Sequence, residues 1–396
     1  MAGRDASGHR PGIQRGTRRQ SRGAAPGYHR GPGVGCDLGQ LGEYAPSLRN
    51  ELIPGSGGDR TEFSCAARAA LGCRRAPGEQ GILNPVRAVR CAQGGVEVVE
   101  LPEPKGDGVR VKLRSAGICG SDLHLLDSVF APQVTLGHEM AGELADGTPV
   151  AVEPLVVCGE CDCCQRGDYN LCRGGPARLM GVGLDGGMSE TIVVPEQCLV
   201  ALAPGVSVRD ACLVEPMAVA VHGVRRGGVA PGDRVAVIGG GTIGLCALVA
   251  CRAAGASVAL YARHDRQREA GERLGAGRTQ DEYDIVIESA GTDSALESAV
   301  QLARPGARLI LLATYWQGMN MPAIALCMKE IHVIPSSMYS RDGDLRDFDR
   351  AAALVAQAPD LGEILITHRF PLEAAVEAFA TARDRAQGAI KVVLEA

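Results

Sequence analysis

The sequence of 396 residues predicts an α/β protein in two parts, a β-rich domain and a doubly wound parallel sheet. Three observations support this class. Short runs of alternating apolar and polar residues fill the first half of the organised sequence, a glycine-rich turn between a strand and a helix opens the second half, and four closely spaced cysteines lie between them. Alternation with a period of two is typical of half-buried strands, whereas strands that alternate with helices form parallel sheets.

Composition limits the class of function. The chain is 45% hydrophobic with a mean hydropathy of +0.02, which is typical of globular proteins. Its net charge of −5 argues against a general nucleic-acid binder. No apolar run reaches the roughly 18 residues of a membrane helix, and no signal peptide is visible. We therefore expect a cytoplasmic protein without membrane or nucleic-acid partners, whose 15 cysteines serve metal rather than disulfides.

Residues 1–85 differ from the rest of the chain. They hold 12 Arg, no Lys and 7 acidic residues, a net charge of +5, so the remainder carries −10. Gly, Pro, Arg and Ser dominate, without hydrophobic periodicity, and we expect a disordered leader. A basic arm for nucleic acid and an Arg-rich targeting peptide are the alternatives. Organised sequence begins abruptly at Val86, as if translation could start there.

The expected β-rich domain spans residues 86–216. Gly and Pro separate its short alternating runs, which predict strands over 86–90, 96–101, 109–113, 142–144, 148–152, 191–195 and 198–202. This pattern favours an antiparallel, barrel-like arrangement. One strand ends in a predicted loop that carries Cys119, and His138-Glu139 begins another.

Cys119, His138 and Glu139 offer the three side-chain types that bind zinc well. A site with three protein ligands and one open position is a catalytic arrangement, because the open position takes water or substrate. The alternative is a buried cysteine beside a solvated His-Glu pair.

A second candidate metal site consists of cysteines alone. Two, two and seven residues separate Cys158, Cys161, Cys164 and Cys172. Four thiolates at such spacing close a tetrahedral zinc site, which leaves no open position and indicates a structural role. Disulfides or inert thiols are the alternatives, and we expect Cys163 to point elsewhere.

The parallel sheet is expected over residues 217–338, beginning with a helix over 218–224. The apolar strand 235–238 runs into a G-x-G-x-x-G turn, a helix over 245–254 and a strand over 258–261. This order is the context that a dinucleotide-binding (Rossmann) turn requires. The glycines allow a tight turn, a close approach of pyrophosphate and close helix packing. We therefore expect a dinucleotide to contact Gly239, Gly241, Thr242, Ile243 and Gly244.

The end of the second strand bears on the choice between NAD and NADP. NAD binding favours an acidic residue there, but this chain has Ala262 followed by Arg263, with Arg266 nearby. An arginine without the acid fits a 2′-phosphate and hence NADP. Asp265, which is placed to reach the ribose from one turn later, keeps NAD open.

The remaining elements continue the pattern. Strand 284–288, helix 295–302 and strand 308–312 form the second half of the sheet, and Trp316, the sole tryptophan, follows its carboxyl end, where it either walls a pocket or packs. Residues 339–396 predict a strand over 364–368, a helix over 374–382 and a strand over 389–394. These short strands suggest a return to the β-rich domain.

Taken together, residues 86–396 resemble the zinc-dependent alcohol dehydrogenases of the medium-chain dehydrogenase/reductase superfamily. The motifs occur in family order: Gly117-Ile-Cys-Gly-Ser-Asp, Gly137-His-Glu, the four cysteines, Asn170-Leu-Cys172, Pro231-Gly-Asp and the glycine-rich turn. Val214-Glu-Pro216 is most similar to the polyol (sorbitol-like) and threonine dehydrogenase branch. The resemblance implies a GroES-like catalytic domain beside the Rossmann domain.

The resemblance also implies roles for single residues. Cys119 and His138 correspond to ligands of a catalytic zinc, and Glu139 ligates it or lies beside it. Glu215 occupies the place of a third ligand that is often cysteine, so either Glu139 or Glu215 touches the metal. Asp122 would orient His138. Two further residues, Ser121 and His124, match a proton relay, and the four cysteines match the family's structural zinc lobe.

The implied activity is hydride transfer between a secondary alcohol or polyol and NAD(P), in a homodimer or homotetramer with one catalytic and one structural zinc. Three alternatives lie outside this activity: a zinc-independent quinone or enoyl reductase on the same fold, a protein that only binds the cofactor, and a zinc-ribbon protein. The sequence does not name the alcohol.

Overall fold

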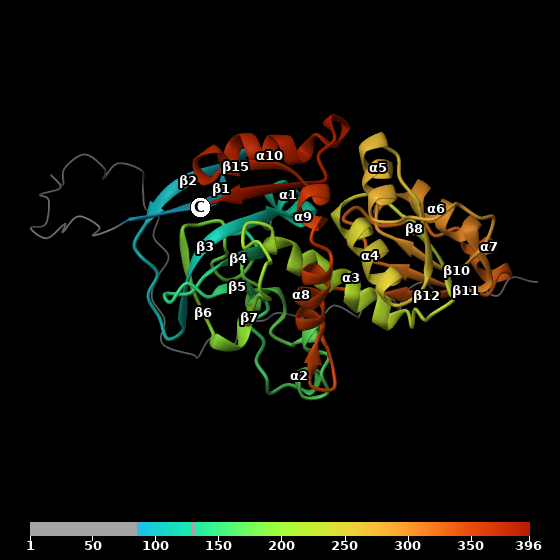
Figure 1. The fold of residues 1–396 in the computed structure, drawn as a ribbon, viewed down its shortest axis with the longest axis horizontal. Coiled ribbons are helices and arrows are strands. Elements are labelled where there is room, and N and C mark those ends of the chain that lie inside the picture. Colours follow the sequence, from blue (N-terminus) through green and yellow to red (C-terminus); the bar gives the residue numbers. More distant parts are fainter. Residues whose placement is uncertain (1–84, 129–130) are drawn as a thin grey trace, which may run out of the picture. The chain divides into compact units, whose positions relative to one another are not determined.

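The computed structural model describes residues 85–128 and 131–396. The predictions for the leader fall, except at Pro85, outside these residues. The two-part α/β class predicted from the sequence is confirmed, with a mainly antiparallel sheet in one part and a parallel sheet in the other (Figure 1).

The β-rich part contains a seven-stranded sheet and a separate hairpin. The sheet has the order β15-β16-β3-β4-β5-β7, with β6 also paired to β3. Only the β15–β16 pair is parallel. The hairpin joins β1 (Val86–Ala92) to β2 (Gly95–Leu101). The predicted strands are confirmed as β3 (Val109–Ile118), β4 (Glu139–Glu143), β5 (Pro149–Val152), β6 (Thr191–Val194) and β7 (Leu199–Ala201).

The loop predicted at Cys119 is wrong. β3 continues to Ile118, and helix α1 (Gly120–Leu126) begins directly after Cys119. Cys119 is the N-cap, and its backbone N–H donates to Asp122 Oδ2 at 2.9 Å. A carboxylate three residues into a helix satisfies a backbone donor that the helix leaves free. The helix therefore fixes the segment that carries the first metal-binding candidate.

The parallel sheet has the order β12-β11-β10-β8-β9. Its strands are β8 (Arg234–Ile238), β9 (Ser257–Tyr261), β10 (Tyr283–Glu288), β11 (Ala303–Leu311) and β12 (His332–Pro335). The helices between them are α4 (Thr242–Ala253), α5 (Asp265–Arg273), α6 (Asp293–Leu302) and α7 (Ala323–Met328). Because β9 and β10 lie on opposite sides of β8, the winding reverses there. Ligands of such sheets bind at this point, beside the carboxyl ends of the strands.

Both faces of β8 are buried, which explains its unbroken apolar sequence. Val235 and Val237 pack in the cluster that contains α4, whereas Ala236 and Ile238 pack with residues of α6. A parallel strand that helices cover on both faces reads as a continuous apolar run.

Two helices lie between the sheets, α3 (Val214–Arg226) and α8 (Asp347–Gln357), and they pack against each other (Figure 1). Before α8 stands the short hairpin of β13 (Arg341–Asp342) and β14 (Leu345–Arg346). After it come α9 (Leu361–Leu365), β15 (Ile366–Pro371), α10 (Ala375–Arg383) and β16 (Lys391–Glu395). The last two strands thus extend the sheet of β3.

The strand predicted to start at residue 364 is wrong in its first two residues. Leu361, Ile364 and Leu365 are buried at helical spacing and form α9, so β15 begins at Ile366. Among the described residues, no helix combines the length and the apolar character that crossing a bilayer requires.

Candidate active site and metal centres

Four cysteines converge in the loop that follows β5, around helix α2 (Asp162–Gln165). Their Sγ atoms are 3.5 Å apart for Cys161 and Cys164, 3.6 Å for Cys172 and Cys158, and 3.8 Å for Cys158 and Cys164. A tetrahedral zinc with metal–sulfur distances of about 2.3 Å has ligand–ligand edges of about 3.8 Å. The cluster, called the cysteine lobe below, therefore fits zinc.

The thiols of the lobe differ in their pKa. Backbone N–H groups of Arg173 and Cys164 lower the pKa of the Cys161 thiol to about 6, whereas burial raises the pKa of Cys164 to about 12. Four adjacent thiolates repel one another unless a cation lies between them. Cys163 stays outside the cluster, and its Sγ lies 3.2 Å from Nη2 of Arg166.

A second cluster joins Cys119, His138 and Glu139. In the antiparallel register of β3 and β4, Gly117 lies opposite Glu139. This pairing brings Cys119, which directly follows β3, close to His138, which directly precedes β4. One ligand atom from each of the three side chains lies within 4.8 Å of the others. His138 and Glu139 are buried and Cys119 is half-buried. A thiolate, an imidazole and a carboxylate are ligands that zinc accepts together.

The imidazole of His138 is fixed from both sides. Nδ1 lies 3.3 Å from Asp122 Oδ1, an ion-pair distance without the alignment of a hydrogen bond, and Nε2 lies 3.3 Å from Ser121 Oγ. Burial lowers the pKa of His138, but Asp122 and Cys119 outweigh it and raise the pKa well above its ordinary value. A metal ion takes only neutral imidazole, so binding here releases a proton.

Glu139 has a partner that sequence reasoning missed. Nζ of Lys391, on β16, lies 2.7 and 2.5 Å from the two carboxylate oxygens of Glu139 and 3.0 Å from the carbonyl oxygen of Ile118. A Cβ at Gly117 would lie 2.0 Å from Glu139 Oε2, so only glycine fits there. Any metal at this cluster therefore shares the carboxylate with a buried ammonium.

Glu215 lies beside this cluster rather than in it. Its carboxylate, in the first turn of α3, is buried. Among the described residues, the ligand atoms that lie within 4.8 Å of one another come from Cys119, His138 and Glu139, and not from Glu215. Burial raises the pKa of Glu215 to about 7, although the charge of His138 opposes the rise. The buried hydroxyl of Tyr339 faces the same carboxylate.

His124 links the two parts of the molecule. It lies on α1, and its ring stacks on Trp316, which follows β11, with the ring centres 5.3 Å apart. Partial burial and the charges of Arg385 and Arg383 lower the pKa of His124, while Asp127 raises it. The imidazole is therefore neutral at pH 7.

The glycine-rich turn has the backbone that its sequence predicts. Gly239 has a φ of +105°, and a Cβ at Gly244 would lie 1.8 Å from the carbonyl oxygen of Gly239. A Cβ at Gly241, the N-cap of α4, would meet no atom within 4 Å, so the turn is open on that side. The backbone N–H groups of Thr242 and Ile243 lie in the first turn of α4, where an anion is favoured.

The end of β9 carries positive charge. Arg263 and Arg266 are exposed, while Asp265 is ion-paired with Arg268. Arg268 Nη1 also donates to the carbonyl oxygens of Ala262 and Arg263, at 2.9 and 2.8 Å. Asp265, the acid nearest the end of β9, is thus already ion-paired.

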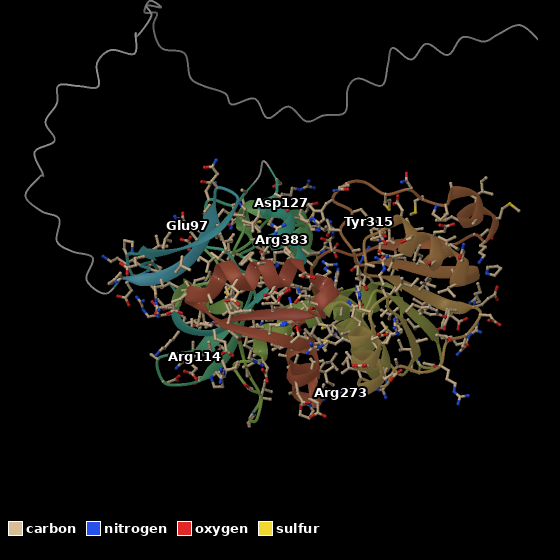
Figure 2. All side chains as sticks on the ribbon, turned by 90° about the horizontal axis from the view of Figure 1, so that it is seen from above. Glu97, Arg114, Asp127, Arg273, Tyr315 and Arg383 are labelled. Carbon is tan, nitrogen blue, oxygen red and sulfur yellow. The ribbon has the colours of Figure 1, made fainter. Side chains whose placement is uncertain are left out.

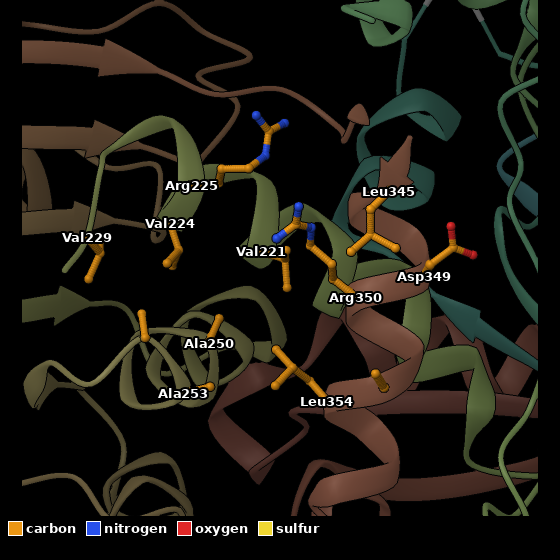
Figure 3. Close-up of a pocket in the computed structure, with 12 residues that line it drawn as sticks. Val221, Val224, Arg225, Val229, Ala250, Ala253, Leu345, Asp349, Arg350 and Leu354 are labelled. Atoms are coloured by element: carbon orange, nitrogen blue, oxygen red, sulfur yellow. The ribbon is translucent and has the colours of Figure 1, made fainter. Parts of the chain in front are cut away.

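An apolar cavity lies away from these residues. A cavity of about 440 Å³ separates α3, α4 and α8, and Figure 3 shows Val221, Ala250 and Leu354 pointing into it. Arg225 at its edge is held by Asp347. Its lining offers no metal ligand set or nucleophile.

Comparisons with known proteins agree with this architecture. The model of the alcohol dehydrogenase GroES-like domain matches residues 105–204, and that of the zinc-binding dehydrogenases matches residues 242–357. These matches define an NAD(P)-dependent oxidoreductase with a GroES-like and a Rossmann domain.

Individual relatives give the family directly. Galactitol 1-phosphate 5-dehydrogenase of Escherichia coli (strain K12) is 32% identical, covering 77% of this chain and 98% of its own. L-galactonate-5-dehydrogenase of the same strain is 30% identical, with 71% and 89% covered. A zinc-binding dehydrogenase structure from Sinorhizobium meliloti 1021, bound to NADP, has a TM-score of 0.71 and 30% identity, with 79% and 100% covered. The chain belongs to the zinc-dependent alcohol dehydrogenases of the medium-chain dehydrogenase/reductase superfamily.

Proposed function

We propose that this dehydrogenase oxidises a secondary alcohol of a polyol or sugar derivative at the cluster of Cys119, His138 and Glu139. One observation carries the proposal. Thr242 Oγ1, at the start of α4, donates to the carbonyl oxygen of Ile390 at 2.9 Å, and the next residue, Lys391, holds Glu139. The glycine-rich turn and the metal-ligand cluster are thus joined through two consecutive residues. The polyol class is supported by the relatives that act on galactitol 1-phosphate and L-galactonate.

The residues present suit both cofactors of the family. Cys119 Sγ, a ring nitrogen of His138 and a Glu139 oxygen would hold a catalytic zinc, and the cysteine lobe would hold a structural one. Zinc supplies Lewis acidity that makes an alcohol hydroxyl acidic near neutral pH, and nicotinamide supplies the hydride acceptor. Asp122 fixes the imidazole of His138, and Lys391 limits the movement of Glu139.

Two side chains give the substrate proton a route to solvent. Ser121 Oγ lies 3.3 Å from His138 Nε2, beside the ligand cluster, and would accept the hydroxyl proton of an alcohol there. His124 lies on the same helix, is exposed, and has a lowered pKa, so a ring nitrogen is free to accept a proton at pH 7. We assign the proton transfer from Ser121 to His124 and then to water.

The cofactor proposed for this chain is NADP. Arg263 and Arg266 are exposed beside the end of β9, and Asp265, the acid nearest the strand end, is ion-paired with Arg268. Arg263→Ser should lower kcat/KM for NADP about 10-fold and leave kcat/KM for NAD nearly unchanged. Steady-state kinetics with both cofactors tests this, and an equal effect on both contradicts it.

The assembly proposed is a homodimer, or a homotetramer built from it, formed through β12. Among the described strands this edge strand pairs only with β11, and Ile324 and Met328 on the neighbouring α7 are 83% and 80% exposed. Free strand edges and apolar side chains are stabilised by a second copy. Light scattering should show a dimer or tetramer, and Met328→Lys should shift it towards monomer. A cytoplasmic location remains part of the proposal.

The function is tested by screening polyols, sugar acids and sugar phosphates with NAD and NADP on zinc-loaded protein. Reduction of the cofactor with a polyol-type substrate, lost after zinc chelation and restored by zinc, is the expected result. Turnover that survives complete metal removal would instead favour the zinc-independent quinone or enoyl reductase.

A further inference from the structure

The segment of residues 384–390, between α10 and β16, lies against the start of two helices of the parallel sheet. A Cβ at Gly388 would lie 3.0 Å from Cδ of Arg266 on α5, and the carbonyl oxygen of Ile390 accepts from Thr242 on α4. The segment has a defined turn, because Asp384 accepts hydrogen bonds from the backbone and side chain of Gln387. The segment therefore lies beside the glycine-rich turn at Ile390 and beside α5 at Gly388.

Arg385 in this segment reaches the opposite side, towards the metal-ligand cluster. A Cβ at Gly120, the residue after Cys119, would lie 3.6 Å from Nη2 of Arg385. The charge of Arg385 also acts on His124 of the same helix. The absence of a side chain at residue 120 thus leaves room for this guanidinium beside the start of α1.

The charge of Arg385 is not compensated by the protein. Two residues earlier, Arg383 forms a bidentate pair with Asp127, at 2.7 and 3.0 Å, and the two side chains lie together in Figure 2. Over residues 85–128 and 131–396, the side chain of Arg385 has no ion pair or hydrogen bond, and the neighbouring Asp384 accepts from Gln387. Arg385 is thus an exposed, unpaired charge in the segment whose Ile390 contacts Thr242 at the start of α4, where an anion is favoured.

We propose that Arg385 is a cofactor-binding residue that contacts the pyrophosphate of the dinucleotide held at Gly239–Gly244, from the catalytic-domain side. This inference rests on the proposed cofactor site and adds a residue from outside the glycine-rich turn. Guanidinium binds phosphate oxygens in a planar, two-pronged geometry, and Arg385 retains all its donors for this purpose. Because the pyrophosphate is common to both cofactors, Arg385 should serve NADH and NADPH alike, unlike Arg263.

The test is a titration of purified zinc-loaded protein with NADH, NADPH and ADP-ribose, followed by fluorescence or calorimetry. Arg385→Gln should raise the Kd of all three about 10-fold or more, and Arg385→Lys should recover part of the loss. The matched control is Arg278→Gln, because Arg278 is exposed and lies near the amino end of β9, away from the glycine-rich turn. Unchanged Kd in this control is expected.

Other outcomes separate the two proposals. If the wild-type protein binds both cofactors but Arg385→Gln binds all three probes as tightly, the role of Arg385 is wrong and the cofactor site stands. If the variant only raises KM for sugar acids or sugar phosphates, the anion that meets Arg385 belongs to the substrate and the inference is overturned. Absence of cofactor binding by the wild-type protein would overturn the cofactor site itself. Equal melting temperatures of wild type and variant exclude a folding effect.

Discussion

The two metal-binding clusters of this protein differ in how the chain builds them. The cysteine lobe takes four like ligands from one short stretch between Cys158 and Cys172. The active-site cluster takes three different ligands from the ends of β3 and β4, and its surroundings come from α1 and the C-terminal β16. Four thiolates fill every position around zinc, whereas three protein ligands leave one for substrate. We therefore expect the local cluster to serve stability and the cluster assembled from distant segments to serve chemistry.

The largest effect is expected from removing an active-site ligand. His138→Ala should lower turnover at least about a thousand-fold, because it removes a ligand of the proposed catalytic zinc. The measurements are turnover and zinc content, which should fall by one equivalent while NADPH still binds. His368→Ala, on β15 outside both clusters, is the control. Undiminished turnover in His138→Ala would show that this cluster does not hold a catalytic zinc, and would contradict the proposed difference between the two clusters.

Removing a ligand of the cysteine lobe should mainly affect stability. Cys161→Ser should lower stability by about 4 kcal/mol, which corresponds to a melting temperature roughly 10 °C lower, with the loss of the other zinc equivalent. Calorimetry and metal analysis measure this. Cys163→Ser is the matched control, since Cys163 is a buried neighbour outside the cluster. A normal melting temperature with both zinc equivalents retained would contradict a structural role for the lobe.

A third substitution sharpens the comparison by testing a buried ion pair that the active-site cluster has and the cysteine lobe lacks. Lys391→Met leaves the buried carboxylate of Glu139 without its ammonium partner, which should destabilise the metal-free protein by about 3 kcal/mol. Zinc compensates the same carboxylate, so the loss should be smaller in the zinc-loaded protein. Urea unfolding of both forms measures the difference. An equal loss in the two forms would show that Glu139 does not face the metal.

The smallest effect is expected from a buried carboxylate outside both clusters. Asp347 accepts from His222 Nδ1, two nitrogens of Arg225 and the backbone of Ser340, and so ties α8 to α3. Burial raises the pKa of Asp347, but these donors outweigh it and lower the pKa to about 2. Because the folded-state pKa lies below the unfolded one, the stabilisation is fully present above about pH 4 and is lost as the pH falls towards 2.

Asp347→Asn should therefore lower stability by about 2 kcal/mol at pH 7, and its difference from the wild type should shrink between about pH 4 and pH 2. Urea unfolding across this range is the measurement. Activity per folded molecule should stay normal, because Asp347 belongs to neither cluster. A large loss of activity in fully folded Asp347→Asn would show that the α3–α8 contact also shapes the active site.

Much of the fold was predictable because its signals are local. The alternation of β3 to β7, the apolar run of β8 and the glycine-rich turn each depend on neighbouring residues. The convergence of Cys158, Cys161, Cys164 and Cys172 followed from their spacing. Helix α8 was not predicted, although Phe348, Ala351 and Val355 are buried at helical spacing. Helix α1 was missed because its N-cap is a cysteine rather than a typical capping residue.

The sequence by itself determined the two-part α/β class, the closed cysteine lobe and the candidate ligands Cys119 and His138. Only the tertiary structure showed that Glu139 is held by Lys391, that Glu215 lies outside the ligand group, and that His124 stacks on Trp316. The reason is physical. Motifs record residues that a single turn or strand holds together, whereas these contacts form only when β16 pairs with β3 and the segment after β11 meets α1.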